Sequence, residues 1–184
     1  MQNPGSNTNG HHGHSSVRQS PWTGLLPLTV LILMLGAITP RAVALELLGF
    51  EHQSLSDGSI SNLKHLKGKP TLLMFYEPDC PWCFKQGRAF NKLLSHCGEE
   101  LQIVALGTHG DKASLKRELW KMKPDFPGFI AGQEMINSVG DLPATPMTLI
   151  ADSNGEFISY MRGYIKLETL EPLLKKQLGL TCKG

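Results

Sequence analysis

Two cysteines separated by two residues stand in the stretch FYEPDCPWCFKQ (75–86), directly after a run of apolar and aromatic residues. At this spacing Cys80 and Cys83 are compatible with three kinds of chemistry: a redox-active dithiol, half of a metal site, or a small structural disulfide. Because the spacing alone fits all three, the neighbouring residues must choose between them.

The residues after Cys80 favour redox chemistry. A helical period begins at Pro81 and continues to about His96, which places Cys80 at the N-cap and Pro81 at the first helical position. Unpaired backbone N–H groups and the positive end of the helix dipole then stabilise the Cys80 thiolate, the form that attacks a disulfide. Cys83, one turn along, can attack the resulting mixed disulfide and release the product. The negative charge of Glu77 works against the thiolate.

The other readings of the pair are weaker. A disulfide that closes so short a loop restrains little chain entropy, although it would pin the strand–helix junction. A zinc set of Cys80, Cys83, His96 and Cys97 would place its two halves ~20 Å apart along the helix. A c-type haem requires His directly after the second cysteine, where Phe84 stands. We therefore expect no metal and no organic cofactor.

The N-terminal part of the chain has the pattern of a secretory signal. Arg18 precedes the apolar run GLLPLTVLILMLGAI (24–38), and Ala42-Val43-Ala44 offers a small-x-small cleavage site. We predict a signal peptide over residues 1–44 and an exported, periplasmic or similar, location. The alternative is an uncleaved membrane anchor formed by 24–38, although this run is shorter than the ~20 residues of a spanning helix.

The composition of the remainder is that of one soluble domain. The chain of 184 residues is 41% apolar and 18% charged. All 16 acidic residues follow position 45, and the same part of the chain contains 16 basic residues, so its net charge is zero. A role in nucleic-acid binding is therefore not expected. The four cysteines are even in number, and outside the cytosol they can form two disulfides.

Hydrophobic patterns predict an alternation of strands and helices. Residues 45–70 are interpreted as turns and short extended pieces, and Asn154-Gly155 as a hairpin turn. The predicted elements are strands at 71–76, 101–106, 147–152 and 156–162, and helices at 81–96, 111–122, 132–139 and 166–178. The first half requires a parallel crossover and the second an antiparallel pair. This order predicts an α/β fold with a mixed central sheet and helices on both faces.

Two long stretches resemble the thioredoxin superfamily, and specifically its exported TlpA-like branch, which includes the ResA and CcmG types. LSDGSISNLKHLKGKPTLLMFYEPDCPWC (55–83) is similar to the opening of that family, and TPMTLIADSNGEFISYMRGYI (145–165) to its second half. The resemblance covers nearly all of residues 45–182. It implies a thioredoxin-like domain over 45–184 and a thiol–disulfide oxidoreductase activity.

The resemblance also implies a substrate-binding surface. Pro146 would be a cis-proline beside the active site and would turn the backbone of Thr145 toward the cysteines, where it can pair with an extended substrate segment. The alternative is a trans-proline that opens an edge strand. Trp82 would lie exposed between the cysteines and offer an apolar surface to a partner, or have an ordinary packing role.

Two positions depart from the thioredoxin pattern. Met74 stands where many thioredoxins have a buried acid, and Asp79 stands where thioredoxin has Trp. We therefore expect Glu77 or a water molecule to act as the base for Cys83.

The family fold further implies a second disulfide. In this fold the helix after the CxxC and the last helix run parallel on one face, away from the active site. Their C-terminal ends would carry Cys97 and Cys182, so we expect a structural Cys97–Cys182 disulfide. The alternative is two unpaired thiols.

The sequence therefore predicts an exported enzyme that exchanges disulfides with protein substrates through a CPWC site, in the reductase or interchange direction. Its expected partners are protein thiols and disulfides and a membrane-bound redox partner, and we expect a monomer. The alternative is a non-enzymatic adaptor in which Cys80–Cys83 stays permanently oxidised. A Cys83→Ala variant separates the two, because only an enzyme traps mixed disulfides.

Overall fold

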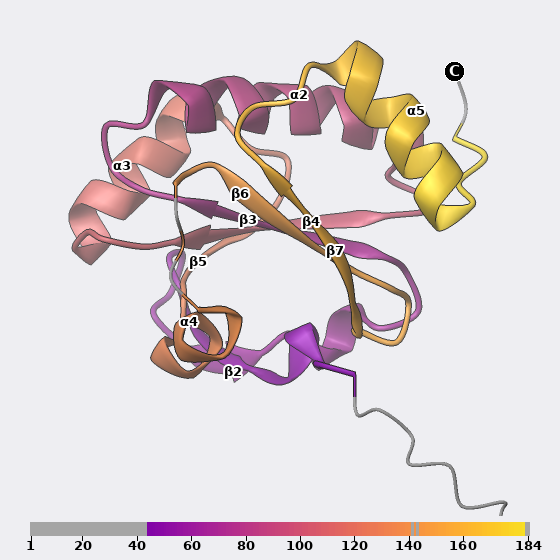
Figure 1. Cartoon of the computed structure of the whole chain (residues 1–184). Helices are drawn as coiled ribbons and strands as arrows, with labels where there is room; N and C mark the ends of the chain where they lie inside the picture. Colours follow the sequence, from indigo (N-terminus) through magenta and orange to yellow (C-terminus); the bar gives the residue numbers. More distant parts are fainter. Residues whose placement is uncertain (1–43, 141, 143, 183–184) are drawn as a thin grey trace, which may run out of the picture. The chain divides into compact units, whose positions relative to one another are not determined.

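Seven strands and four α-helices make up the part of the chain that the computed structural model describes, residues 44–140, 142 and 144–182 (Figure 1). The strands are β1 (Glu51–Ser54), β2 (Ile60–Asn62), β3 (Thr71–Tyr76), β4 (Gln102–Gly107), β5 (Gly128–Ile130), β6 (Met147–Ala151) and β7 (Phe157–Arg162). The helices are α2 (Pro81–Cys97), α3 (Lys112–Met122), α4 (Gln133–Val139) and α5 (Leu167–Leu178), with short 3₁₀ turns η1 (Leu47–Gly49) and η2 (Lys64–Leu66).

The strands form one mixed sheet in the order β2-β1-β5-β4-β3-β6-β7. β3 pairs with β4, and β4 with β5, in parallel, whereas the remaining neighbours are antiparallel. All six residues of β3 are buried, because helices cover both faces of the sheet at its centre. The predicted α/β fold with a mixed sheet is confirmed. β3 lies inside this sheet, and the chain leaves its C-terminal end to reach Cys80.

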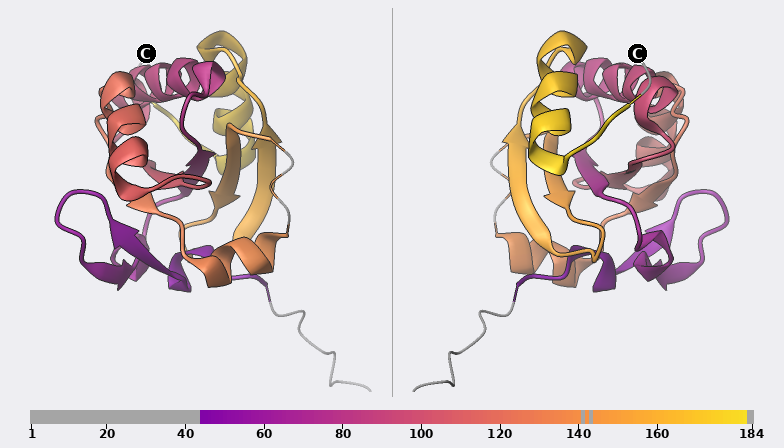
Figure 2. Two further views of the ribbon diagram at one scale, coloured as in Figure 1. Left: turned by 90° about the vertical axis from the view of Figure 1, so that its left-hand side faces the viewer. Right: turned by 90° about the vertical axis from the view of Figure 1, so that its right-hand side faces the viewer.

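Helices lie on both sides of the sheet (Figures 1 and 2). Side chains of α2, α3 and α5 pack with one face of β3 and β4 in a core that includes Met74, Tyr76 and all four cysteines. The other face packs against η1 and α4, through residues such as Leu47 and Met135. Cys80, Cys83 and the helices that pack around them therefore belong to a single core cluster.

The structure adds one strand, β5, that the sequence patterns did not predict. Residues 45–70 were interpreted as turns and short extended pieces; two of these pieces are β1 and β2, which pair with each other and extend the sheet beyond β5. β5 has only three residues, too few for a periodic pattern to reveal it. The other elements agree with the predicted ranges to within about one residue, and Pro172 lies inside α5.

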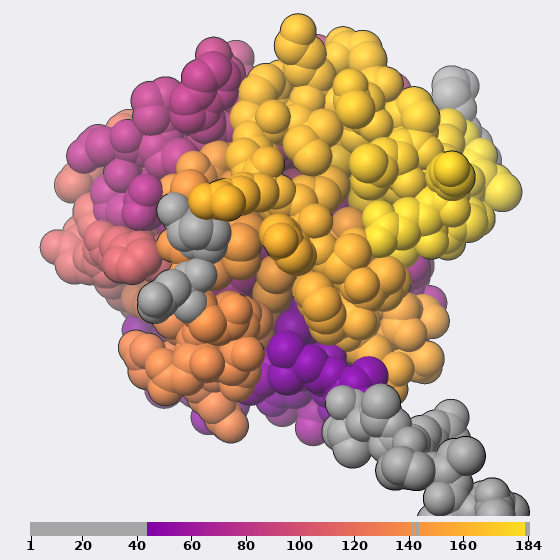
Figure 3. Space-filling view, in the orientation of Figure 1, coloured from indigo at the N-terminus to yellow at the C-terminus, as the bar shows by residue number. Residues whose placement is uncertain are grey.

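At the other edge of the sheet, β7 is mostly exposed. Together with α5 it forms much of the face shown in Figure 3. No helix among residues 44–140, 142 and 144–182 is long and apolar enough to cross a membrane. The predicted signal or anchor segment 24–38 lies outside the described residues.

Candidate active site

The Cys80–Cys83 pair lies where β3 ends and α2 begins. Cys80 is the N-cap of α2 and Pro81 takes the first helical position, as the sequence predicts. The two cysteines form a disulfide, with their Cα atoms 5.3 Å apart. The backbone N–H of Cys83 also donates to Cys80 Sγ at 3.1 Å. The sulfur of Cys80 thus caps the N-terminus of a 17-residue helix, at the positive end of its dipole, an arrangement that stabilises a thiolate.

The two sulfurs differ in their surroundings. Cys83 is fully buried, whereas Cys80 is 7% exposed and is followed by the exposed Pro81 and Trp82. Asp79, with a left-handed backbone (φ 55°), turns its side chain outward, where it is 95% exposed. An incoming partner therefore meets Cys80 first, and Cys83 is held behind it in the core.

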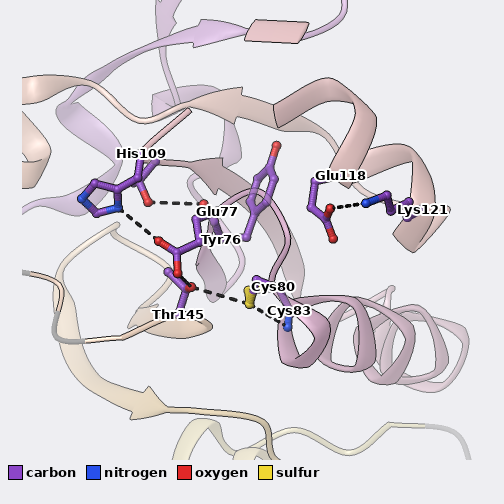
Figure 4. The surroundings of a disulfide bond; sticks show 9 residues. Tyr76, Glu77, Cys80, Cys83, His109, Glu118, Lys121 and Thr145 are labelled. Carbon is purple, nitrogen blue, oxygen red and sulfur yellow. Dashed lines mark hydrogen bonds and ion pairs between the residues drawn. A yellow bond between two sulfur atoms is a disulfide. The ribbon is translucent and has the colours of Figure 1, made fainter. Parts of the chain in front are cut away.

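Thr145 and Pro146 approach the pair from the loop before β6. The Thr145–Pro146 peptide bond is cis, the isomer that the family resemblance implies. The Thr145 hydroxyl lies 3.6 Å from Cys80 Sγ and donates a hydrogen bond of 2.7 Å to Glu77 Oε1 (Figure 4). Because a hydroxyl has one proton, it donates either to the carboxylate or to the sulfur. In the reduced protein the Cys80 thiolate would compete for this proton.

Glu77 connects this hydroxyl to a histidine. Its second oxygen lies 3.4 Å from Nδ1 of His109, a residue with left-handed backbone in the loop after β4. The two carboxylate oxygens thus face Thr145 and His109 on the Cys80 side of the pair (Figure 4). These contacts of Glu77 are with Thr145 and His109 and do not involve Cys83. The expected role of Glu77 as a base for Cys83 therefore stays a prediction.

A second acidic residue near the pair was missed by the sequence analysis. Glu118 on α3 is only 4% exposed, and its carboxylate is 2.8 Å from Nζ of Lys121. The same ammonium lies 3.9 Å from Asp79, the residue before Cys80. The signal was present in the sequence, because Glu118 interrupts the inward stripe Leu115, Leu119 and Met122 of α3. Burial of a paired carboxylate at such a position marks a candidate functional residue.

Tyr76, the last residue of β3, lies above the cysteine pair and beside Glu118 in the view of Figure 4. Its buried hydroxyl donates to the backbone carbonyl of Leu115 at 3.1 Å. Desolvation, with a smaller contribution from the Glu118 charge, raises the pKa of Tyr76 well above its ordinary value. The phenol therefore stays neutral and fastens α3 to β3. Met74, two residues earlier, is buried in the core, so the strand itself supplies no acid.

Trp82 forms an exposed aromatic surface beside the pair. It is 53% exposed and stacks on Tyr164, with ring centroids 6.0 Å apart. Lys85 Nζ lies 4.1 Å from the centroid of the Trp82 ring. The loop that carries Tyr164 is tied to α2, because the N–H of Ile165 donates to the buried side chain of Gln86 at 2.8 Å. The aromatic pair is thereby held at a fixed place next to Cys80.

Cys97 and Cys182 form a second disulfide at the far end of α2, with Cα atoms 4.5 Å apart. This is the pairing that the family resemblance implies, and both residues are buried. Beside it, the carboxylate of Glu100 accepts bonds of 2.9 Å and 3.0 Å from the backbone and hydroxyl of Thr181. These bonds hold the pKa of Glu100 below its usual value and tie the end of the chain to the loop after α2.

The zinc set considered above is not brought together. Its cysteines belong to two separate disulfides, and His96 lies 2.9 Å from a carboxylate oxygen of Glu171. Among the residues that the structure describes, no group of three His, Cys, Asp or Glu side chains is placed to hold a metal ion.

Comparison with known proteins agrees with this geometry. The model of the AhpC/TSA family matches residues 43–171. The thiol-disulfide oxidoreductase ResA of Bacillus anthracis is 30% identical over 122 residues, which cover 65% of this chain and 70% of ResA. The soluble secreted antigen MPT53 of Mycobacterium tuberculosis is 27% identical over 133 residues, or 70% of this chain and 76% of that protein.

A solved structure shows the same fold. A secreted Mycobacterium tuberculosis disulfide oxidoreductase, described as homologous to Escherichia coli DsbE, superposes with a TM-score of 0.60 at 19% identity and covers 71% of this chain and 98% of that one. The family match, the ResA similarity and the thioredoxin-like architecture around a CxxC pair lead to one conclusion. The chain belongs to the AhpC/TSA family of thioredoxin-fold proteins and is a thiol–disulfide oxidoreductase of the TlpA-like, ResA/CcmG type.

Proposed function

We propose that this protein is an exported enzyme that exchanges disulfides with protein substrates through Cys80-Pro81-Trp82-Cys83. The observation that carries the proposal is the placement of Cys80 Sγ at the N-cap of α2, 3.1 Å from the Cys83 N–H and 3.6 Å from the Thr145 hydroxyl. All of these groups favour a thiolate at the one sulfur of the pair that a partner can reach. No cofactor is required, because the electrons are held by the two thiols.

In the reducing direction the Cys80 thiolate attacks one sulfur of a substrate disulfide. A bond forms between Cys80 and that sulfur, and the other substrate sulfur leaves as a thiolate and takes up a proton. Cys83 then loses its proton and attacks Cys80 Sγ, which forms the Cys80–Cys83 disulfide and releases the second substrate thiol. Two electrons pass from the enzyme to the substrate, and the reverse sequence oxidises a substrate dithiol.

The residues around the pair take supporting roles in this scheme. Thr145 and Pro146 provide the backbone against which an extended substrate segment lies, and Trp82 provides an apolar contact beside it. Once Cys80 is a thiolate, the Thr145 hydroxyl shifts its proton from Glu77 toward the sulfur and stabilises the charge. Glu77 in turn is held by His109.

The wider setting follows from the N-terminal pattern and the relatives. Residues 1–44 serve as a signal peptide, or as an anchor through 24–38, and 45–184 form the thioredoxin-like domain. MPT53 and the solved disulfide oxidoreductase are described as secreted. The protein acts as a monomer on protein thiols and disulfides, and a membrane-bound redox partner recharges it. We favour the reductase or interchange direction.

A trapping experiment tests the proposal. A Cys83→Ala variant cannot resolve the mixed disulfide, so an enzyme accumulates covalent Cys80–substrate adducts that a reductant releases. A Cys80→Ala variant is the matched control and should trap nothing. If neither variant traps a partner from the compartment in which the protein is found, the protein is an adaptor and the proposal is wrong.

The direction of exchange is tested by the reduction potential of the Cys80–Cys83 pair, measured with Cys97–Cys182 intact. A value near that of thioredoxin, about −270 mV, supports a reductase. A value near about −120 mV makes the protein an oxidant that donates its disulfide.

A further inference from the structure

A groove with a volume of about 550 Å³ runs along the exposed side of α2 and meets the start of α5. Four of its lining residues are exposed cations: Lys85, Arg88, Lys92 and Lys166. The first three recur at helical spacing and therefore share one face of α2. A single carboxylate, Glu168, lies among the lining residues, so the groove keeps a net positive charge.

The positive charge of this groove is not neutralised within the described part of the chain. None of its four cations is within ion-pair distance of a carboxylate there, whereas Lys67, Lys121 and Lys175 elsewhere each form such a pair. Residues 45–184 contain equal numbers of basic and acidic residues. The groove is therefore a local concentration of positive charge on a domain with no net charge, which is the signature of an anionic partner.

The groove is linked to the surface beside the cysteine pair through Tyr164 and Lys85. Tyr164 lines the groove and stacks on Trp82, the residue between Pro81 and Cys83. Lys85 belongs both to the groove and to this aromatic surface, because its ammonium lies over the Trp82 ring at 4.1 Å. A chain that is bonded to Cys80 and crosses Trp82 would enter the groove next.

We propose that the groove binds an acidic segment of the substrate polypeptide, next to the cysteine that reacts with Cys80. The inference rests on the proposed function and names its substrate class. From Trp82 to Lys92 the helix rises about 15 Å, and an extended chain covers that distance in about five residues. The acidic residues are therefore expected within about five positions of the reacting cysteine.

Two synthetic peptides test this assignment. Each holds one cysteine in a mixed disulfide with 2-mercaptoethanol, a neutral leaving group, and carries either three Glu or three Gln within five residues of it. The Cys80 thiolate of the reduced enzyme attacks the peptide sulfur and 2-mercaptoethanol leaves as a thiolate. Cys83 then displaces the peptide thiol, and the enzyme is left oxidised by two electrons. The second-order rate constant is measured from the released peptide.

The Glu peptide is expected to react about tenfold faster than the Gln peptide at low ionic strength, with the gap closing near 0.5 M salt. In an Arg88→Glu/Lys92→Glu variant the ratio should fall to about one or below. A Lys69→Glu/Lys176→Glu variant changes the net charge equally, but at the start of β3 and the last turn of α5. This control should keep the preference, and circular dichroism confirms that both variants are folded.

The outcomes separate this inference from the proposed function. Equal rates for the two peptides, or an unchanged preference in the groove variant, overturn the acidic-segment assignment while the exchange activity stands. If reduced enzyme reacts with neither peptide, the proposed function itself fails. A third outcome is that the two peptides react equally, and that the enzyme and the control variant sediment with phosphatidylserine vesicles whereas the groove variant does not. The groove is then a membrane-binding site and the proposal is wrong.

Discussion

Helix α2 carries a disulfide at each end, Cys80–Cys83 at its N-terminus and Cys97–Cys182 at its C-terminus. The first closes a sequence separation of 3 and the second one of 85. Near the first lie the Thr145 hydroxyl, the Glu77 carboxylate that it donates to and the exposed Trp82, whereas the second joins the last residue of α2 to the segment after α5. One helix thus carries two disulfides. They lie at opposite ends of the helix dipole, and they close loops of very different length.

The difference separates chemistry from stability. At the N-terminus the helix dipole favours a thiolate, the form that takes part in disulfide exchange, and the short loop adds little chain entropy. At the C-terminus the dipole disfavours a thiolate, and the long loop makes the bond a strong restraint on the unfolded chain. One helix therefore has one disulfide suited to reaction and one suited to holding the fold.

The largest expected effect is on activity. Cys80→Ser should reduce disulfide exchange, measured as insulin reduction, to the rate without enzyme, because Ser does not form a disulfide. A Cys97→Ala/Cys182→Ala variant, assayed at a temperature where it is folded, should retain most of the activity. Comparable losses in both variants would break the division between the two ends of α2.

The second expected effect is on stability. Loss of the Cys97–Cys182 bond should lower the free energy of unfolding by about 4.5 kcal/mol, the chain-entropy value for so long a loop. Loss of the Cys80–Cys83 bond in a Cys80→Ser/Cys83→Ser variant should cost only about 1.5 kcal/mol on the same basis. Urea unfolding of the two double variants measures this contrast, and equal losses would contradict it.

The third expected effect is on the pH dependence of the free energy of unfolding, which we assign to a histidine away from the cysteine pair. His52 on β1 is 1% exposed, and desolvation lowers its pKa from 6.5 to about 4. The unfolded chain binds a proton more readily between these values, so stability is complete above pH 6.5 and falls as the pH drops toward 4. The expected loss is about 3 kcal/mol.

A His52→Asn variant tests this assignment. Nδ1 of His52 accepts a hydrogen bond of 3.0 Å from the N–H of Gly132, and the Asn side-chain oxygen can replace that acceptor. Stability measured by urea unfolding should then depend less on pH between 4 and 6.5. An unchanged slope would mean that a group other than His52 titrates in this range.

The smallest effect concerns the hydroxyl beside the redox pair. Thr145→Val keeps the shape of the side chain and removes the donor that faces Cys80 Sγ. In the reduced protein, alkylation of Cys80 by iodoacetamide at neutral pH should slow about fivefold, the equivalent of one hydrogen bond of about 1 kcal/mol. Unfolding in urea serves as the control, and an unchanged alkylation rate would remove Thr145 from the thiolate's surroundings.

Much of the fold could be predicted from the sequence, because its signals are local. The six-residue apolar run of β3, the period of α2 after Pro81 and the Asn154-Gly155 turn each depend on residues near one another in the chain. β5 was missed, and the pairing of the short extended pieces β1 and β2 was not predicted, because short strands acquire their structure from pairing across the sheet.

For the site, the sequence by itself determined the CxxC pair, its position at the start of a helix and the likeness to TlpA-like proteins. The resemblance also placed Thr145 and Pro146 beside the pair. The tertiary structure alone decided which other distant side chains lie near it. His109, Glu118 and Lys166 come from three different segments, and no pattern near Cys80 refers to them. Their proximity follows from how the sheet and helices pack. A contact between distant side chains depends on the topology of the fold, whereas the start of a helix depends only on residues that are neighbours in the sequence.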